Sequence, residues 1–180
     1  MDWYTLFKFL HVLTAIIWIG GAFIMLIFGM NAARQNDDAK LVSVAAQMGW
    51  AAERVYVPAS MATVLFGIIV ATIGGLWDQA WVIIGLVGMV ITMALGILVL
   101  SPLAKSVAAA SATAAAVKSS KNLVTLVKFD CATLFVVVAD MVLKPQTNEW
   151  IIIGLMAAIV GLAALVWLIP TLRRPRSAAA

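Results

Sequence analysis

The sequence predicts an all-α membrane protein: a bundle of five transmembrane helices with the N-terminus outside and the C-terminus in the cytoplasm. Of its 180 residues, 64% are hydrophobic and 11% are charged. In soluble domains about half of the residues are hydrophobic and about a quarter are charged. Five apolar runs reach the roughly 20 residues that cross a bilayer, and none alternates as a barrel strand does. The runs lie near residues 4–29, 55–77, 81–103, 123–143 and 150–170. We expect one transmembrane domain over residues 1–172 and a basic cytoplasmic tail at 173–180.

Basic residues give the predicted direction of the chain, because Lys and Arg gather in cytoplasmic loops. They concentrate after the first run, after the third run and in the tail, at Arg34, Lys40, Arg54, Lys105, Lys118, Lys121, Arg173, Arg174 and Arg176. The loops at 77–80 and 144–149 carry few charges and are expected outside. The net charge of +4 forms no basic patch with interleaved aromatic residues, so no nucleic-acid partner is predicted.

Between the runs, the sequence predicts two further features. Asn36, Asp37 and Asp38 are possible N-caps for an amphipathic interfacial helix that leads into the second run. Pro58 lies four residues into that run and is expected to relieve or kink its first turn. The alanine-rich stretch 106–120 has no large apolar face, so we expect an extension of the third helix.

Glycines recur at a spacing of seven residues in the second and fifth runs. Gly67 with Gly74, and Gly154 with Gly161, share a helix face. Small residues let neighbouring helices approach closely. We therefore expect helix packing at both pairs.

Ionisable groups in the outer half are the main candidate site. Lys8, His11 and Trp18 follow the spacing of one helix face. Asp140 and Lys144, at the outer end of the fourth run, reach the same depth. We expect an outer cluster in which Asp140 lies near Lys8 or His11. The alternatives are snorkelling lysines and, for His11, a structural hydrogen bond, a haem ligand or proton handling.

A second group of charges lies near the cytoplasmic side. Arg54 at the start of the second run and Asp130 in the fourth are expected to form an interhelical pair. Its expected role is structural, because either charge would be costly to bury alone.

The first run resembles the first helix of two known families. Lys8-x-x-His11, with Trp18 seven residues later and then Gly21, is similar to HemJ-type protoporphyrinogen oxidases and to copper-resistance D-type membrane proteins. The HemJ resemblance implies that His11 ligates haem and that Lys8 lies beside the porphyrin. The arginine and further histidine of the HemJ pattern are absent after Gly21. Over its whole length, including "DMVLKP" at 140–145, the chain resembles a bacterial family of integral membrane proteins of unknown function, which implies the bacterial inner membrane.

Three functions remain open from the sequence. The first is haem b bound by His11 for a redox or electron-transfer role, with Trp18 packing below the ring and Lys8 close to a propionate. Because the chain has one histidine, the iron is expected to be five-coordinate, to take Met89 or Met156 as its sixth ligand, or to bind a second His11 from a dimer. The second is a subunit or assembly factor of a larger membrane complex. The third is a small transporter or proton conductor that uses Lys8, His11 and Asp140. No catalytic constellation and no zinc ligand set are readable.

Overall fold

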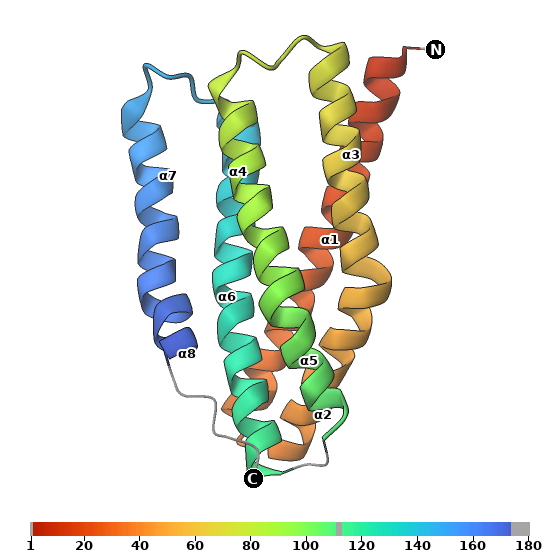
Figure 1. Ribbon diagram of the computed structural model, residues 1–180, viewed down its shortest axis with the longest axis vertical. Coiled ribbons are helices and arrows are strands. Elements are labelled where there is room, and N and C mark those ends of the chain that lie inside the picture. The colour runs from red at the N-terminus through yellow and green to blue at the C-terminus, as the bar shows by residue number, and fades with distance from the viewer. Residues whose placement is uncertain (1, 111–112, 174–180) are drawn as a thin grey trace.

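The computed structural model describes residues 2–110 and 113–173, and Figure 1 shows their arrangement. All regular structure in these ranges is helical, which confirms the predicted all-α class. The α-helices are α1 (Trp3–Arg34), α2 (Asp38–Ala51), α3 (Val57–Ile73), α4 (Ala80–Leu95), α5 (Ser101–Ala108), α6 (Ala114–Leu143), α7 (Trp150–Ala163) and α8 (Ile169–Arg173). Short π-helical segments join some of them, namely η1 (Ala52–Tyr56), η2 (Gly96–Leu100) and η3 (Ala164–Leu168).

The helices run up and down the long axis of the bundle (Figure 1). The turns α3–α4 and α6–α7 lie at the end that holds the N-terminus, here the upper end, and the turns α1–α2 and α5–α6 lie at the lower end. α1 packs against α2, α3 and α6, and α4 packs against α6. α7 packs against α6 at one edge of the bundle. α6 is therefore the helix around which most of the others gather.

Within residues 2–110 and 113–173, four helical stretches are long and apolar enough to cross a membrane. They are Trp3–Arg34, Asp38–Ile73, Ala80–Ala108 and Trp150–Arg173, and they hold four of the five predicted runs, except residues 74–77 of the second run. The remaining run, residues 123–143, lies in α6, whose apolar part also carries Lys128, Asp130 and Asp140. At about 1.5 Å per residue, the 32 residues of α1 extend about 48 Å, which exceeds about 30 Å of hydrocarbon.

The segment after α1 differs from the predicted interfacial helix. Asp37 is the N-cap, and its side chain accepts a hydrogen bond from the Lys40 amide, within the cap region that the sequence indicated. α2 then continues through η1 into α3 as one helical stretch. Its apolar residues Leu41 and Ala45 are buried against other helices of the bundle. The apolar face that predicted a membrane-surface helix thus packs inside the protein.

The alanine-rich stretch also departs from the prediction. The third helical stretch ends at Ala108, and residues from Ala114 onward begin α6. The Thr113 side chain caps α6 by accepting a hydrogen bond from the Ala116 amide. Ala116 and Ser120 are buried, because small side chains let α6 approach its neighbours closely. The absence of large apolar residues here reflects tight packing.

Each π-helical segment ends two residues before a proline. η1 precedes Pro58, η2 precedes Pro102 and η3 precedes Pro170. A proline in a helix interior lacks the amide donor, and its ring clashes with the carbonyl four residues earlier. A wider turn removes that clash. Pro58 therefore lies in the middle of a continuous helix. The sequence had predicted that it lies in the first turn of a separate transmembrane helix.

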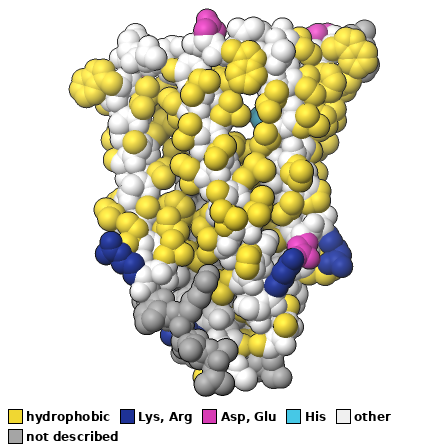
Figure 2. Space-filling model, in the orientation of Figure 1, with side chains coloured by type: hydrophobic (Ala, Val, Ile, Leu, Met, Phe, Trp, Pro, Cys, Tyr) yellow, Lys and Arg dark blue, Asp and Glu magenta, His cyan; other side chains and the backbone are white. Residues whose placement is uncertain are grey.

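The buried residues form separate core clusters. The lower cluster joins α1, α2, α5 and α6 through residues such as Leu26, Leu41 and Leu123. The upper cluster joins α1, α3, α4 and α6 and includes Trp18 and Leu134. Many other large apolar side chains are exposed on the outer surface, and Figure 2 shows them covering most of the visible face. Such a surface suits contact with lipid.

Candidate functional site

His11 faces α3 and is held there by a hydrogen bond. Its Nδ1 lies 2.8 Å from the backbone oxygen of Thr63. Because a carbonyl oxygen only accepts, Nδ1 carries the proton in this contact. A neutral ring then has its lone pair on Nε2, where it can accept a proton or bind a metal. In Figure 2 the one histidine is visible between apolar side chains in the upper half of the molecule.

Gly67 makes room for the His11 ring. A Cβ atom at Gly67 would lie 3.0 Å from Cε1 and 3.1 Å from Nδ1 of His11. The Thr63 hydroxyl donates to the backbone oxygen of Ala59, and it also lies 2.9 Å from the Thr14 hydroxyl of α1. The ring is therefore fixed between α1 and α3 by one hydrogen bond and by direct contact with backbone.

The predicted glycine pairs have different surroundings. A Cβ atom at Gly74 would meet the Tyr4 ring at 2.9 Å, so both glycines of α3 allow α1 to approach closely. At Gly154 and Gly161 an added Cβ atom would meet nothing within 4 Å. Close helix packing is thus confirmed for the first pair, whereas among the described residues of this chain no helix packs closely on the second pair.

The structure separates the other members of the predicted first-helix face. Lys8 is exposed, and its Nζ lies 5.9 Å from the centre of the Tyr4 ring. Trp18 is buried in the upper core cluster beside Met89. Seven residues separate Trp18 from His11, which is about 10 Å along α1. Trp18 thus lies about two helical turns deeper than His11, and Lys8 lies nearer the upper end.

Asp140 is the most completely buried charged side chain among the described residues. Its exposed fraction is 0%, and neither carboxylate oxygen has a hydrogen-bond partner in the described part of the chain. Oδ2 lies 3.1 Å from the position that a Cβ atom would take at Gly85 of α4. Asp140 therefore faces the α4 backbone in the interior of the bundle.

The expected ion pairs of Asp140 are absent from the described structure. Within the described ranges no cationic nitrogen lies within ion-pair distance of Asp140. Lys144 ends α6 in a left-handed conformation, and its Nζ lies 5.4 Å from the centre of the Trp81 ring. Met156 is buried on α7, the helix that packs against α6 at the bundle edge.

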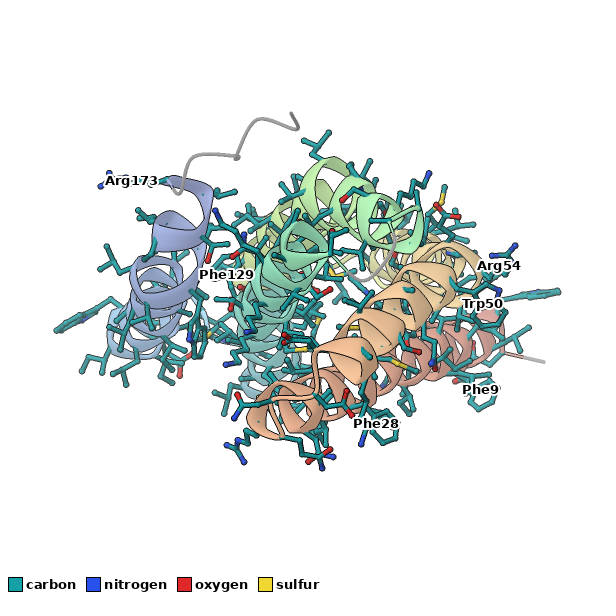
Figure 3. The ribbon with its side chains drawn as sticks, turned by 90° about the horizontal axis from the view of Figure 1, so that it is seen from below. Phe9, Phe28, Trp50, Arg54, Phe129 and Arg173 are labelled. Carbon is teal, nitrogen blue, oxygen red and sulfur yellow. The ribbon has the colours of Figure 1, made fainter. Side chains whose placement is uncertain are left out.

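The predicted pair of Arg54 with Asp130 does not form. The Arg54 guanidinium lies 5.4 Å from the centre of the Trp50 ring, and Figure 3 shows both side chains at the outer edge of the bundle. Asp130 is 7% exposed, and its Oδ1 has no hydrogen-bond partner among the described residues. Arg54 belongs to η1, whose wider turn changes the direction of its side chains relative to a regular helix.

Asp130 lines a cavity in the interior of the bundle. The cavity has a volume of about 100 Å³ and lies between α1, η1 with α3, α4 with η2, and α6. No group of three potential metal ligands occurs among the described residues. The single cysteine, Cys131, is free and buried beside the lower core.

Two contributions to this site escaped the sequence analysis. Thr63 holds His11, and Gly85 adjoins Asp140. Both occur inside apolar runs, where a threonine or a glycine is common. Pro58, Pro102 and Pro170 indicate in the sequence where the helices depart from regular α-helical geometry, and the π-helical segments lie just before them.

Comparison with known proteins gives one match. The model of a family described as "Predicted integral membrane protein (DUF2269)" matches residues 5–145. The matched part contains His11, Asp130 and Asp140 and ends just after α6. No curated protein and no solved structure matches the chain.

Proposed function

The chain belongs to this family of predicted integral membrane proteins, and on that premise we propose that it handles protons or another small cation within the membrane. Asp140 and His11 are the groups that we assign to this role. A role as helix locks accounts for the contacts of His11 with α3 but not for the burial of Asp140 without a partner.

The burial of Asp140 without a partner carries the proposal. An ionised carboxylate in the bundle interior costs several kcal/mol unless a proton or a cation neutralises it. The described residues place no cation there. A carboxyl group in this setting takes up a proton or a cation from outside the chain and releases it again. Acidic side chains inside membranes are typical of such pathways.

His11 supplies a second exchangeable position at a neighbouring depth. Trp18, Met89 and Val137 pack in one cluster, and Asp140 lies one helical turn above Val137 on α6. His11 lies two turns above Trp18 on α1. Its Nδ1 is engaged by Thr63, so Nε2 is the nitrogen that can exchange a proton. Lys8 is exposed and takes no part in this proposal, unlike in the sequence prediction.

The charge distribution supports a topology in which α6 also crosses the membrane, giving five spans. Most of the described basic residues lie toward the lower end, where Figure 2 shows the basic side chains of the visible face, and Lys and Arg gather on the cytoplasmic side. Exposed tryptophans lie at both levels, with Trp3 and Trp150 above and Trp50 below, as in interfacial aromatic belts. We assign the upper end to the outside of a bacterial inner membrane. Arg174 and Arg176 of the basic tail lie outside the described residues.

Proton flux into liposomes tests this proposal. The purified protein is reconstituted with a pH-sensitive dye inside the vesicles, and a potassium gradient with valinomycin drives proton movement. Wild-type protein should acidify the lumen faster than empty vesicles. Asp140→Asn keeps the shape of the side chain but cannot ionise, and it should abolish the difference. His11→Gln should slow it, because the amide can hydrogen-bond to Thr63 but cannot carry the proton.

Asp78→Asn is the matched control. Asp78 is an exposed carboxylate in the α3–α4 turn, so the same chemical change there should leave the flux unaltered. Equal flux in wild-type and Asp140→Asn vesicles would contradict the proposal. A wild-type protein that conducts no more protons than empty vesicles would also contradict it. In that case a subunit of a larger membrane complex or a homo-oligomer would be the better account, and co-purification would test it.

Haem b is the second candidate, favoured by the hydrogen bond of His11. Histidines that bind metals usually donate the other ring nitrogen to a carbonyl or carboxylate, as Nδ1 does here toward Thr63. This fits one axial ligand. The expected place of Trp18 below the ring is compatible with its position two helical turns below His11 on α1. Lys8 is exposed at the upper end, as expected of a cation near a propionate. The sixth ligand has less support, since Met89 packs beside Trp18 in the core and Met156 lies on α7 at the bundle edge.

An absorption spectrum separates the two candidates. Protein expressed with ample haem would show a Soret band that shifts on reduction with dithionite if His11 ligates iron, and His11→Ala would remove it. The cation proposal expects purified protein without pigment and no spectral change on addition of haemin.

A further inference from the structure

The interior cavity next to Asp130 is a second feature that the cation proposal does not use. Its lining comes from the four helical stretches that surround it, and most of it is aliphatic. Polar groups are few: the Asp130 carboxylate and the hydroxyls of Tyr56, Ser60, Thr92 and Ser101. The cavity is partly open, and its lining residue Ile97 is 52% exposed.

The polar groups of the cavity present mainly acceptors. The Ser60 hydroxyl donates to the backbone oxygen of Val57 at 2.8 Å, and the Thr92 hydroxyl donates to that of Met89 at 3.0 Å. Each hydroxyl has one hydrogen, so only its lone pairs remain for a ligand. Asp130 adds a carboxylate whose Oδ1 has no partner in the described chain. A group with several N–H donors and a positive charge complements this set.

The nearby basic side chains are directed elsewhere. Arg54 stacks on Trp50, and Lys105 pairs with Glu53 at 2.8 Å. Lys128 is two residues from Asp130 on α6, and two residues turn a helix by about 200°, toward the other side. The positive charge that Asp130 needs therefore comes from a proton or from a bound molecule.

The remainder of the lining suits an apolar body. The aromatic rings of Trp18 and Tyr56 border the space, and such rings attract cations as well as hydrocarbon. An engineered apolar cavity of about 150 Å³ admits benzene. A space of about 100 Å³ is smaller, which selects a ligand with a short chain of a few carbon atoms.

Two π-helical segments meet at this cavity. η1 contributes Ala52 and Tyr56, and η2 contributes Gly96, Ile97 and Leu100. π-Helical turns occur frequently at functional sites, since they displace side chains and expose backbone locally. Their coincidence at one space, on two different helical stretches, is an observation independent of the charge of Asp130.

We propose that this cavity binds a small organic monocation, with a primary ammonium group at Asp130 and a short alkyl body between Trp18 and the aliphatic lining. The site differs from Asp140 and His11, and its existence does not depend on proton flux. Its ligand class is set by one unpaired carboxylate, by the Ser60 and Thr92 hydroxyls, whose hydrogens are already donated to the backbone, and by a narrow apolar space.

Butylammonium is a suitable probe because it carries three N–H donors and four carbon atoms. Its binding to the full-length protein in detergent is measured by calorimetry, beside 1-butanol as the neutral molecule of equal chain length and potassium as a cation without an alkyl chain. All titrations share one pH and one ionic strength. We expect saturable binding of butylammonium and at least tenfold weaker binding of the other two.

Variants then locate the site. Asp130→Asn should weaken butylammonium binding at least tenfold, whereas Asp78→Asn in the exposed α3–α4 turn should leave it unchanged. Gly96→Leu fills the cavity without altering Asp130. An added Cβ atom there meets nothing within 4 Å, so the chain should accept the change, and butylammonium binding should be lost.

Three results would overturn the inference: equal affinity for butylammonium and 1-butanol, an Asp130→Asn variant that binds as wild type does, or undiminished binding in Gly96→Leu. Should Asp130→Asn fail to fold, the Gly96→Leu result and the comparison of probes decide the question. Loss of proton flux in Asp140→Asn with retained butylammonium binding would separate this site from the one proposed above.

Discussion

Replacing Gly67 by alanine tests whether the His11 contact holds α1 against α3. The new methyl group would lie 3.0 Å from Cε1 and 3.1 Å from Nδ1 of His11, so the ring must retreat by a few tenths of an ångström. The same Nδ1 donates a 2.8 Å hydrogen bond to the carbonyl of Thr63, one turn earlier on α3, so a ring that moves away from α3 weakens this bond. The methyl group and the hydrogen bond therefore compete for the position of the ring.

The magnitude follows from three contributions. Overpacking costs about 1–3 kcal/mol, and weakening the hydrogen bond costs up to about 0.5–1.5 kcal/mol. Alanine favours the helix over glycine by about 0.5–1 kcal/mol. The free energy of unfolding should fall by roughly 1–3 kcal/mol, and the melting temperature by about 2–4 °C per kcal/mol for a chain of this size.

Thermal unfolding in detergent, followed by circular dichroism, measures the effect. Gly154→Ala is the matched control, because it is also a glycine inside an apolar helix, and its Cβ atom would meet nothing within 4 Å. The control should melt slightly above wild type through its helix propensity. If Gly67→Ala melts as high as Gly154→Ala, the close contact of His11 with α3 is refuted.

Three further predictions concern the remainder of the bundle. A reporter inserted after Gln35, in the α1–α2 turn, should be cytoplasmic and one after Gln146 external; the reverse result at both would contradict the assigned orientation. Lys105→Ala removes the exposed ion pair with Glu53, so its melting temperature should match wild type; a large decrease would show that the pair is shielded from water. Cys131 is buried, so maleimide should label it only after unfolding, and rapid labelling of the native protein would contradict its position.

Hydropathy predicted the helices well because length and apolar content decide whether a segment can cross a bilayer. The sequence predicted less well which side chains of different helices contact one another. Lys8 and His11 are three residues apart, which leaves them about 60° apart around the helix, enough to place Lys8 outside. For Arg54 the difference arises from η1, since a helical wheel assumes a regular turn where the chain has a wider one.

The sequence predicted the depth of a side chain along the bundle axis more reliably than the helix that the side chain faces. Asp140 and His11 were both predicted to lie in the outer half of the bundle, and counting turns from the Trp18 cluster supports neighbouring depths. Which helix each one faces depended on glycines and on Thr63 of other helices. A single sequence without its neighbours in space does not supply that information.

The position of the Asp130 cavity has a physical cause in the prolines. The cavity lies where the upper and lower core clusters adjoin, since its lining includes Trp18 of the upper cluster and Leu123 of the lower one. η1 and η2 lie at this junction, and a wider turn changes the register in which side chains interlock with neighbouring helices. The resulting space lacks packing contacts, which lowers stability, and it encloses a carboxylate that is costly to leave unpaired. A bound organic cation offsets both costs at one place. Because the same ligand would contact the upper and the lower cluster, its binding should make the two parts of the bundle unfold more nearly as one unit.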